Sequence, residues 1–275
     1  MQRLVKREHL STKPIQTILA MKKLLLLSCL LIGSLLVNAQ GTIDAKQVFN
    51  QINSGQKAAY VEATISGDLD LTELSTKRRL EKNSRWGGQN AYESKVKVPL
   101  IFKNCRFTGN VIAFKLMSKD GNRRIFGIEI DGNNNDVYTA DFEEEVIFDN
   151  CVFEGEAAFK YSDFDRIVKF TGCRFKKNAN FKYAHAHTEA IFSSTVFEEY
   201  ADFKYTDFNA LADFQKTTFN NYGDFKYTKF KEASNFDYTT FKGYADFKYT
   251  NFRQNANFNH TSFTGRSDFK YARGR

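Results

Sequence analysis

The sequence predicts an all-β fold: a four-sided parallel β-helix, or solenoid, with about 22 residues per coil and a short N-terminal capping helix. Three observations predict it. Phenylalanine recurs at alternating spacings of five and six residues from Phe142 to Phe269, and Ala186 fills the one slot that lacks it. The tripeptide Phe-Lys-Tyr returns every 22 residues. The chain holds 28 Phe although its mean hydropathy is −0.49, so these rings need a regular buried arrangement.

The 22-residue return indicates the number of sides. Slots 11 residues after each Phe-Lys-Tyr read differently, as in Phe170-Thr171-Gly172 and Phe192-Ser193-Ser194. Four slots, of five, six, five and six residues, therefore complete one coil. Equivalent rings of successive coils should stack at the strand spacing of about 4.8 Å. The predicted core ladder is Phe159, Phe181, Phe203, Phe225, Phe247 and Phe269.

The position two residues before each Phe is small, as in Ala157, Ala179 and Ala201. Because side chains alternate across a strand, this residue and the Phe point the same way. A narrow coil has room for one ring and one small group on each side. We therefore expect four Phe columns that fill the interior and leave no pocket inside it.

Two segments carry a family resemblance: Ala201-Asp202-Phe203-Lys204-Tyr205 and Ala245-Asp246-Phe247-Lys248-Tyr249. They resemble the pentapeptide-repeat motif, which is a small residue, Asp or Asn, Leu or Phe, and two variable positions. The resemblance covers residues 137–273 closely, and 61–74 and 99–114 more loosely. It implies a right-handed quadrilateral β-helix. The extra residue at alternate slots departs from the family's strict period and leaves the corner geometry open.

Residues 1–39 are predicted to be a leader with a signal peptide that starts at about Met21. Lys22 and Lys23 precede the apolar run 24–37, and Val37-Asn38-Ala39 resembles a small-residue cleavage site, so we expect a cut after Ala39. The run is short for a membrane span, although a permanent anchor and a lipoprotein attached at Cys29 are alternatives. We expect an exported protein, periplasmic or extracellular, with no membrane span after cleavage.

Residues 40–60 are predicted to form a helical cap, with Asp44 as N-cap and Gly55 as the stop. Such a helix would cover the open first coil. Residues 61–275 are predicted to be the β-helix, with irregular loop insertions near 75–98 and 115–136, where function tends to concentrate. At the C-terminal end, slot 274 lacks its Phe and no capping helix follows. The uncapped last coil leaves open a homodimer through that end.

Charge and motifs bear on the class of function. Without residues 1–39 the chain has 34 basic minus 31 acidic residues, or +3, which gives little electrostatic reason to expect nucleic-acid binding. We find no phosphate-binding loop, nucleophile elbow or paired-cysteine zinc motif, so we expect neither an enzyme nor a cofactor. Some proteins of the resembled family mimic DNA and protect type II topoisomerases, but that use resembles an acidic, cytoplasmic rod.

Three cysteines follow the leader: Cys105, Cys151 and Cys173. Each occupies the small inward position before a Phe, where Cys serves as a small apolar filler. Because the protein is expected to be exported, a disulfide between Cys151 and Cys173 is the alternative.

A candidate metal site surrounds the missing Phe. His185 and His187 flank Ala186 and should point outward, and the 22-residue register places them near Asp163, Asp165 and Asp207. Two imidazoles and three carboxylates could ligate a divalent metal. The alternative is ordinary His–Asp pairing between neighbouring strands on a solvated face.

The second candidate site is an outward surface ladder of lysines and tyrosines, which could form a flat platform for an anionic glycan. The alternative is a solvated face copied by repeat duplication. The ladder consists of Lys160, Lys182, Lys204, Lys226, Lys248 and Lys270 with Tyr161, Tyr183, Tyr205, Tyr227, Tyr249 and Tyr271.

Two functions are therefore expected from the sequence. The first is an exported, non-enzymatic scaffold or interaction protein that presents a rigid β-helical face, or its two loops, to an unknown protein or envelope partner. The second is a binding module for anionic polysaccharide through the Lys/Tyr ladder.

Overall fold

The computed structural model describes residues 37–38, 41–81, 89–119, 121–125, 135–254 and 256–274. The predicted signal peptide lies outside these residues, apart from the two-residue strand that precedes the expected cleavage site. Residues 37–275 form a compact unit of their own. None of the helices in the described part of the chain is long and apolar enough to span a membrane.

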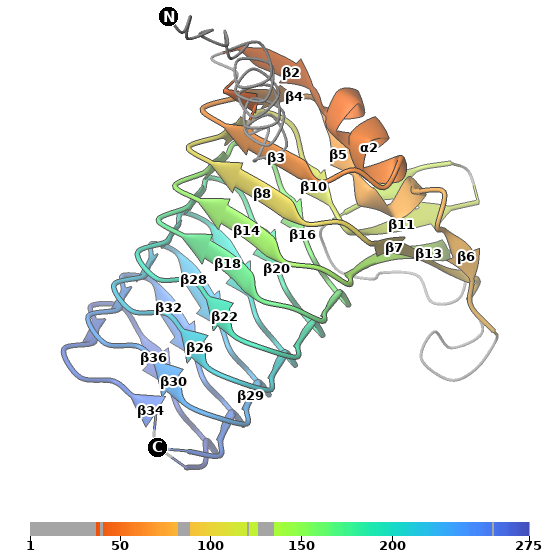
Figure 1. Cartoon of the computed structure of the whole chain (residues 1–275). Helices are drawn as coiled ribbons and strands as arrows, with labels where there is room; N and C mark the ends of the chain where they lie inside the picture. Colours follow the sequence, from red (N-terminus) through yellow and green to blue (C-terminus); the bar gives the residue numbers. More distant parts are fainter. Residues whose placement is uncertain are drawn as a thin grey trace, which may run out of the picture. The chain divides into compact units, whose positions relative to one another are not determined.

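The chain winds as a right-handed parallel β-helix with four sides, which we name A to D (Figure 1). Each side is one sheet, built from one short strand per coil. Side A contains β1 (Val37–Asn38), β3 (Ala58–Val61), β8 (Leu100–Lys103), β14 (Val146–Asp149), β18 (Val168–Thr171), β22 (Ala190–Ile191), β26 (Ala212–Asp213), β30 (Ser234–Asn235) and β34 (Ala256–Asn257). Side B contains β2 (Thr42–Asp44), β4 (Thr64–Ser66), β9 (Arg106–Phe107), β15 (Val152–Phe153), β19 (Arg174–Phe175), β23 (Val196–Phe197), β27 (Thr218–Phe219), β31 (Thr240–Phe241) and β35 (Ser262–Phe263).

Sides C and D complete each coil. Side C contains β5 (Leu69–Asp70), β10 (Val111–Ile112), β16 (Ala157–Ala158), β20 (Ala179–Asn180), β24 (Tyr200–Asp202), β28 (Tyr222–Asp224), β32 (Tyr244–Asp246) and β36 (Ser267–Asp268). Side D contains β13 (Asn135–Phe142), β17 (Asp163–Phe164), β21 (His185–Ala186), β25 (Asp207–Phe208), β29 (Lys229–Phe230) and β33 (Asn251–Phe252). Equivalent residues pair at a separation of 22, as in Phe153 with Phe175 and Phe175 with Phe197, which confirms the predicted fold.

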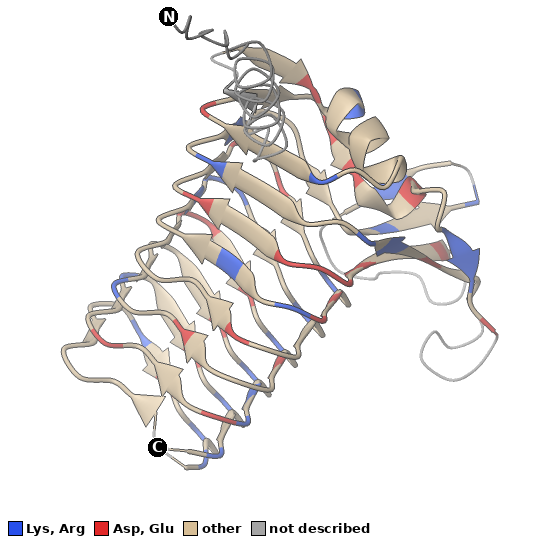
Figure 2. Ribbon diagram, in the orientation of Figure 1, with Lys and Arg blue, Asp and Glu red and all other residues tan. Residues whose placement is uncertain are grey.

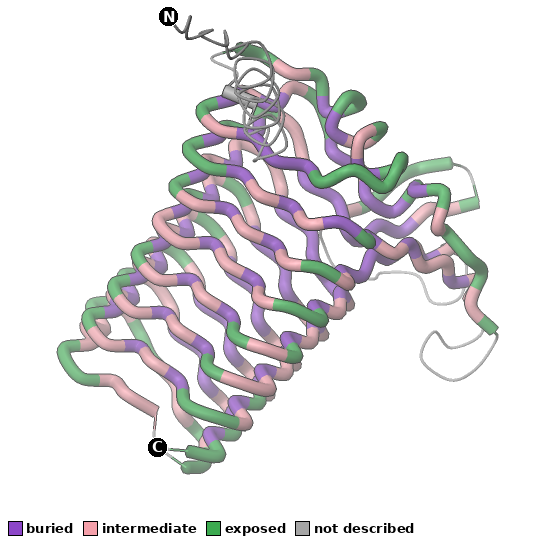
Figure 3. The backbone as a smooth tube through the Cα atoms, viewed as in Figure 1, coloured by how far each residue is buried: buried purple, intermediate pink, exposed green. Residues whose placement is uncertain are grey.

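Four Phe columns fill the interior, one per side, as predicted. Within the side C column the ring centroids lie 5.2 Å apart for Phe159 and Phe181 and 4.7 Å apart for Phe247 and Phe269. The columns of opposite sides A and C meet edge to face, as for Phe192 and Phe203 at 82°, and so do the neighbouring columns of sides B and C, as for Phe197 and Phe203 at 89°. Both arrangements are favourable for aromatic rings. Purple inward positions alternate with pink and green outward ones in Figure 3.

The missing ring at Ala186 leaves a small gap in the side D column. A cavity of about 10 Å³ lies there, lined by apolar groups that include Phe164, Phe181 and Phe208. A space of this size holds at most about one water molecule.

The alternating spacing reflects two kinds of corner. Where consecutive Phe are five apart, a β-turn forms the corner, as shown by the hydrogen bond from the Thr206 N–H to the Phe203 carbonyl at 3.0 Å. The third residue of this turn, Tyr205, has φ +60°, as type II turns require. Where the spacing is six, the extra residue widens the corner. One such corner contains Gly155, where a Cβ would lie 2.6 Å from the Gly109 carbonyl oxygen.

Inward polar residues at two corners bond to the backbone of the coil before. The Thr206 and Thr228 hydroxyls donate to the Phe181 and Phe203 carbonyls at 2.7 Å. Thr217 donates in the same way to Phe192 at 2.7 Å. A threonine can therefore be fully buried here without leaving an unsatisfied hydroxyl.

The N-terminal cap is α2 (Ala45–Asn53), as predicted. The Asp44 carboxylate accepts the Lys46 N–H at 2.8 Å, and Gly55 has φ +76° just after the helix. Its buried face packs onto the first coil, which contains the 3₁₀ helix η1 (Leu71–Glu73). Strands β2 and β3 already belong to the coil, so the coil starts earlier than the predicted boundary at residue 61.

The predicted insertions are not irregular loops in their described parts. They contribute a sheet, which we call the wing, in the order β6 (Arg78–Arg79), β7 (Ala91–Val96), β13, β11 (Phe114–Ser118) and β12 (Arg123–Arg124). Strand β7 pairs parallel with β13, and β11 pairs antiparallel with it. The wing extends sideways from the coils in Figure 1. The prediction of irregular loops was wrong here because the paired strands of the wing are distant in sequence and follow no repeat.

Candidate interaction surfaces

The tyrosines of the surface ladder stack along the corner between sides C and D. Neighbouring ring centroids lie 4.7 to 4.8 Å apart from Tyr161 to Tyr271. All six residues have φ near +60°, so each ring leaves the same kind of turn. Because each ring face is covered by the next ring, the ladder offers ring edges and hydroxyls to a ligand rather than ring faces.

The ladder lysines are less free than a flat platform requires. The ammonium groups of Lys182, Lys204 and Lys226 lie 5.1 to 5.4 Å from the centroid of the next tyrosine. Lys160 is buried, 4.7 Å from the Phe114 ring of the wing and 4.9 Å from Tyr161. Lys248 instead pairs with Asp246 at 3.1 Å. The prediction of a uniform outward lysine row is therefore wrong at Lys160, because the wing covers it.

A groove runs on the other side of the tyrosine ladder, over side D. Its volume is about 480 Å³. It is lined by Tyr205, Tyr227, Lys229, Tyr249, Thr250, Asn251, Tyr271 and Arg273. The sequence interpretation missed this groove, although its basic residues occupy one outward column of the 22-residue register.

Charge changes sign along that outward column of side D. Its first members are Asp163, His185 and Asp207, and its last are Lys229, Asn251 and Arg273. Lys229 lies 3.3 Å from the Asp207 carboxylate at the point where the sign changes. The groove therefore lies at the basic end of the side.

The candidate metal site does not assemble. His185 Nδ1 lies 2.7 Å from the Asp163 carboxylate, whereas His187 Nε2 lies 4.0 Å from Asp165. Asp207 contacts Lys229 and Lys231 instead of a histidine. Within the described ranges, no group of three or more Cys, His, Asp or Glu side chains is placed to hold a metal. The geometry matches the alternative, His–Asp pairing between strands.

The three described cysteines are free thiols, and all are buried. Cys151 and Cys173 donate to the Phe102 and Phe148 carbonyls at 3.4 and 3.3 Å, as the threonines of the same column do in later coils. Burial raises the pKa of the Cys151 thiol. These thiols are fillers of the core.

A column of carboxylates lies buried on side C. Asp202, Asp224 and Asp246 are 3 to 7% exposed, and each accepts the N–H two residues later at 3.0 Å. Burial, and then the neighbouring carboxylate of Asp224, raises the pKa of Asp202 to about 6. Burial also raises the pKa of Asp224, although the Tyr200 hydroxyl donates to it at 2.7 Å. Asn180 occupies the preceding place in the column with the same backbone bond.

The wing is joined to the first coil by opposite charges. Lys115, 5% exposed, lies 2.8 Å from the Asp70 carboxylate and also contacts Glu73. Within the wing, Lys95 of β7 lies 2.9 Å from Asp141 of β13, and burial raises the pKa of Asp141 despite this partner. Both edge strands, β6 and β12, carry two exposed arginines, and β6 is the blue arrow at the right of Figure 2.

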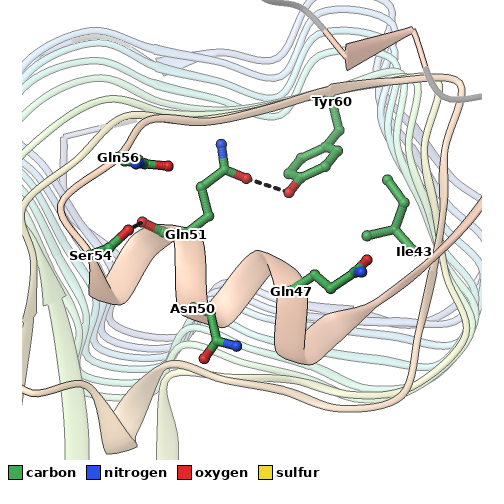
Figure 4. A pocket seen from close by; sticks show the side chains of 7 residues that line it. All are labelled: Ile43, Gln47, Asn50, Gln51, Ser54, Gln56 and Tyr60. Carbon is green, nitrogen blue, oxygen red and sulfur yellow. Dashed lines mark hydrogen bonds between the residues drawn. The ribbon is translucent and has the colours of Figure 1, made fainter.

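A second hollow lies at the N-terminal end (Figure 4). It measures about 590 Å³ and lies between α2 and Tyr60 of β3. Its polar lining is uncharged, mostly amides such as Gln47 and Asn50. Gln51 is already engaged, since it accepts from the Tyr60 hydroxyl and donates to the Lys57 carbonyl at 2.7 Å.

Comparison with known proteins gives one match. The family model described as pentapeptide repeats (9 copies) matches residues 139–185 and 225–273. Neither the curated proteins nor the solved structures contain a significant match to the chain. The matched residues lie in the Phe coils and include every member of the core ladder except Phe203.

Proposed function

The repeats of this chain belong to the pentapeptide-repeat family, and from that premise we propose that the protein is an exported, non-enzymatic scaffold. It presents a rigid β-helical face to a protein or envelope partner in the periplasm or the medium. The packed Phe core supports this proposal, because it fills the space in which a catalytic pocket would form.

The observation that carries the proposal is the wing. It interrupts an otherwise regular coil and places two stacked tyrosines, Tyr92 and Tyr138 with centroids 4.8 Å apart, beside Lys77 and Lys115. Tyrosine and arginine are enriched at protein interfaces, and the wing carries exposed arginines in β6 and β12 in addition to these tyrosines. Its short edge strands end in arginine pairs, which disfavour edge-to-edge aggregation and leave the faces for a partner.

Site-specific photo-crosslinking tests the scaffold proposal. A benzophenone amino acid replaces Tyr92 on the wing or, as control, Tyr238, which is 52% exposed on a corner of the repeats. We expect one discrete crosslinked species in cells from the wing position and none from Tyr238. Equal crosslinking from both positions, or none from either, would reject the wing as the presented surface.

Export has its own test. N-terminal sequencing of the protein recovered from outside the cytoplasm should begin at Gln40. Cleavage there removes β1, which pairs with β3 through residues 37 and 38. A chain that stays in the cytoplasm with Met1 or Met21 at its terminus would overturn this part of the proposal.

A second function, binding of anionic polysaccharide through the Lys/Tyr ladder, is favoured by the groove beside the ladder. Replacing Lys204, Lys226 and Lys248 with Ser should abolish retention on an acidic glycan column. Crosslinking from Tyr92 should be unchanged in this variant, since the wing lies elsewhere. If the triple variant binds the column like the wild type, these lysines are not the ligand contacts.

A further inference from the structure

The groove on side D combines a row of phenol hydroxyls with a cluster of cations. We propose that it binds a linear acidic polysaccharide, one whose sugars carry carboxylates. The proposal rests on the second function above and adds Lys229, Asn251 and Arg273 to the ladder lysines as contacts for the ligand.

The cations of the groove are available to a ligand. Arg273 is exposed and forms no ion pair within the described part of the chain. The Lys229 side chain is 57% exposed even though it contacts Asp207. A guanidinium presents two parallel donors that match a carboxylate, so Arg273 suits a uronate-type sugar.

The tyrosine wall suits the uncharged part of such a ligand. Tyr205, Tyr227, Tyr249 and Tyr271 line the groove, and their rings are stacked face to face. Their phenol hydroxyls can donate and accept hydrogen bonds, as sugar hydroxyls do. Because the ring faces are covered, recognition by stacking a sugar on an aromatic face is open only at the end of the ladder.

The spacing favours a polysaccharide over an acidic peptide. Successive tyrosines of the groove lie 4.7 to 4.8 Å apart. Side chains on one face of an extended peptide repeat at about 6.7 Å, twice the rise per residue, and fall out of step with this row. The groove combines two cations with four tyrosines, so a ligand that carries hydroxyls as well as carboxylates matches it better than an acid without hydroxyls.

Binding to polygalacturonate tests the proposal, with its methyl ester as the uncharged polymer of the same backbone and poly-glutamate as the peptide alternative. The purified protein is titrated with each by calorimetry at two salt concentrations. We expect saturable, salt-sensitive binding to polygalacturonate and none to the ester. The variant Lys229→Gln/Arg273→Gln should bind at least about tenfold more weakly, the scale of one lost charged hydrogen bond. Its matched control is Lys177→Gln/Lys242→Gln, two exposed lysines outside the groove.

Each other outcome overturns a defined part. An equal loss of binding in the control variant rejects the groove as the binding site. Equally tight binding of poly-glutamate rejects a polysaccharide as the preferred ligand. If Lys204, Lys226 and Lys248 matter and the groove variant binds normally, the second function stands and this assignment fails. If the wild type binds neither polymer, both fail. A sedimenting dimer that loses its contact in the groove variant would show that a second copy occupies the groove.

Discussion

The two parts of the solenoid are stabilised by different rules. In the part before Phe142, opposite charges meet: Lys115 pairs with Asp70 and Glu73, and Lys95 pairs with Asp141. In the later coils, several columns place a residue on its own copy, so that Phe stacks on Phe, Tyr on Tyr and Asp on Asp. Stacking of identical residues is favourable for aromatic rings and unfavourable for buried carboxylates, which repel one another. Regular repetition therefore stabilises the Phe core and destabilises the column of buried aspartates on side C.

The largest expected effect comes from removing a ring from the copied part. Phe203→Ala should lower the free energy of unfolding by about 4 kcal/mol, since this fully buried ring contacts Phe181 and Phe225 in its column. Phe263→Ala, in the last coil, should cost clearly less because Phe263 is only partly buried. Urea unfolding followed by circular dichroism measures both. Equal losses of stability in the two variants would contradict the idea that Phe203 contributes more because rings stack on both of its faces.

The carboxylate column predicts a pH-dependent gain. Asp202 has a folded pKa of about 6, above its unfolded value, so its favourable contribution is complete below about pH 4 and is lost as pH rises through 6. Asp202→Asn should therefore stabilise the protein by up to about 3 kcal/mol at pH 8 and by almost nothing at pH 4.

Asn180 occupies the position equivalent to Asp202 one coil earlier, and its side chain already accepts the same backbone hydrogen bond. Asn180→Asp should destabilise at pH 8 and not at pH 4. Denaturant midpoints across this range measure both variants, and a gain for Asp202→Asn that is independent of pH would contradict the electrostatic cause.

The opposite-charge contacts of the first part predict a moderate loss. Lys115→Met leaves Asp70 and Glu73 without their buried partner and should cost about 2 kcal/mol, less than a fully buried pair because both carboxylates are partly exposed. Lys119→Met, at an exposed position of the same wing, is the control. Hydrogen exchange should show faster exchange in β11 and β13 only for Lys115→Met. Uniform acceleration across the later coils would mean that the wing and coils unfold together.

The smallest effects concern the column that changes from cysteine to threonine between Cys173 and Thr195. Cys173→Thr should change stability by less than about 1 kcal/mol, because Thr195 makes the equivalent bond one coil later. Thr217→Val should cost about 1 kcal/mol through the lost hydroxyl bond to Phe192. Thermal unfolding resolves these changes, and a large loss for Cys173→Thr would show that the thiol does more than fill space.

The sequence predicted the coils well because repetition sets both the register and the inward face. Ala186, α2 and the Phe columns lie where the spacing placed them. The wing was not predicted, since β7 pairs with β13 about 46 residues away and nothing in its composition repeats. The candidate sites needed side-chain directions: Asp207 turns to Lys229, and Lys160 is buried, neither of which the register alone decides.

The corner turns have a consequence for length. Each coil closes through its own turns and bonds its neighbours in one repeating register, as in Asp207 with Lys229. Insertion of one further 22-residue unit among the later coils would replace the pairs at one junction with equivalent ones and leave all other pairs intact. It would add one tyrosine, or about 4.8 Å, to the ladder. The length of the solenoid and of its tyrosine ladder therefore changes only in steps of one whole coil.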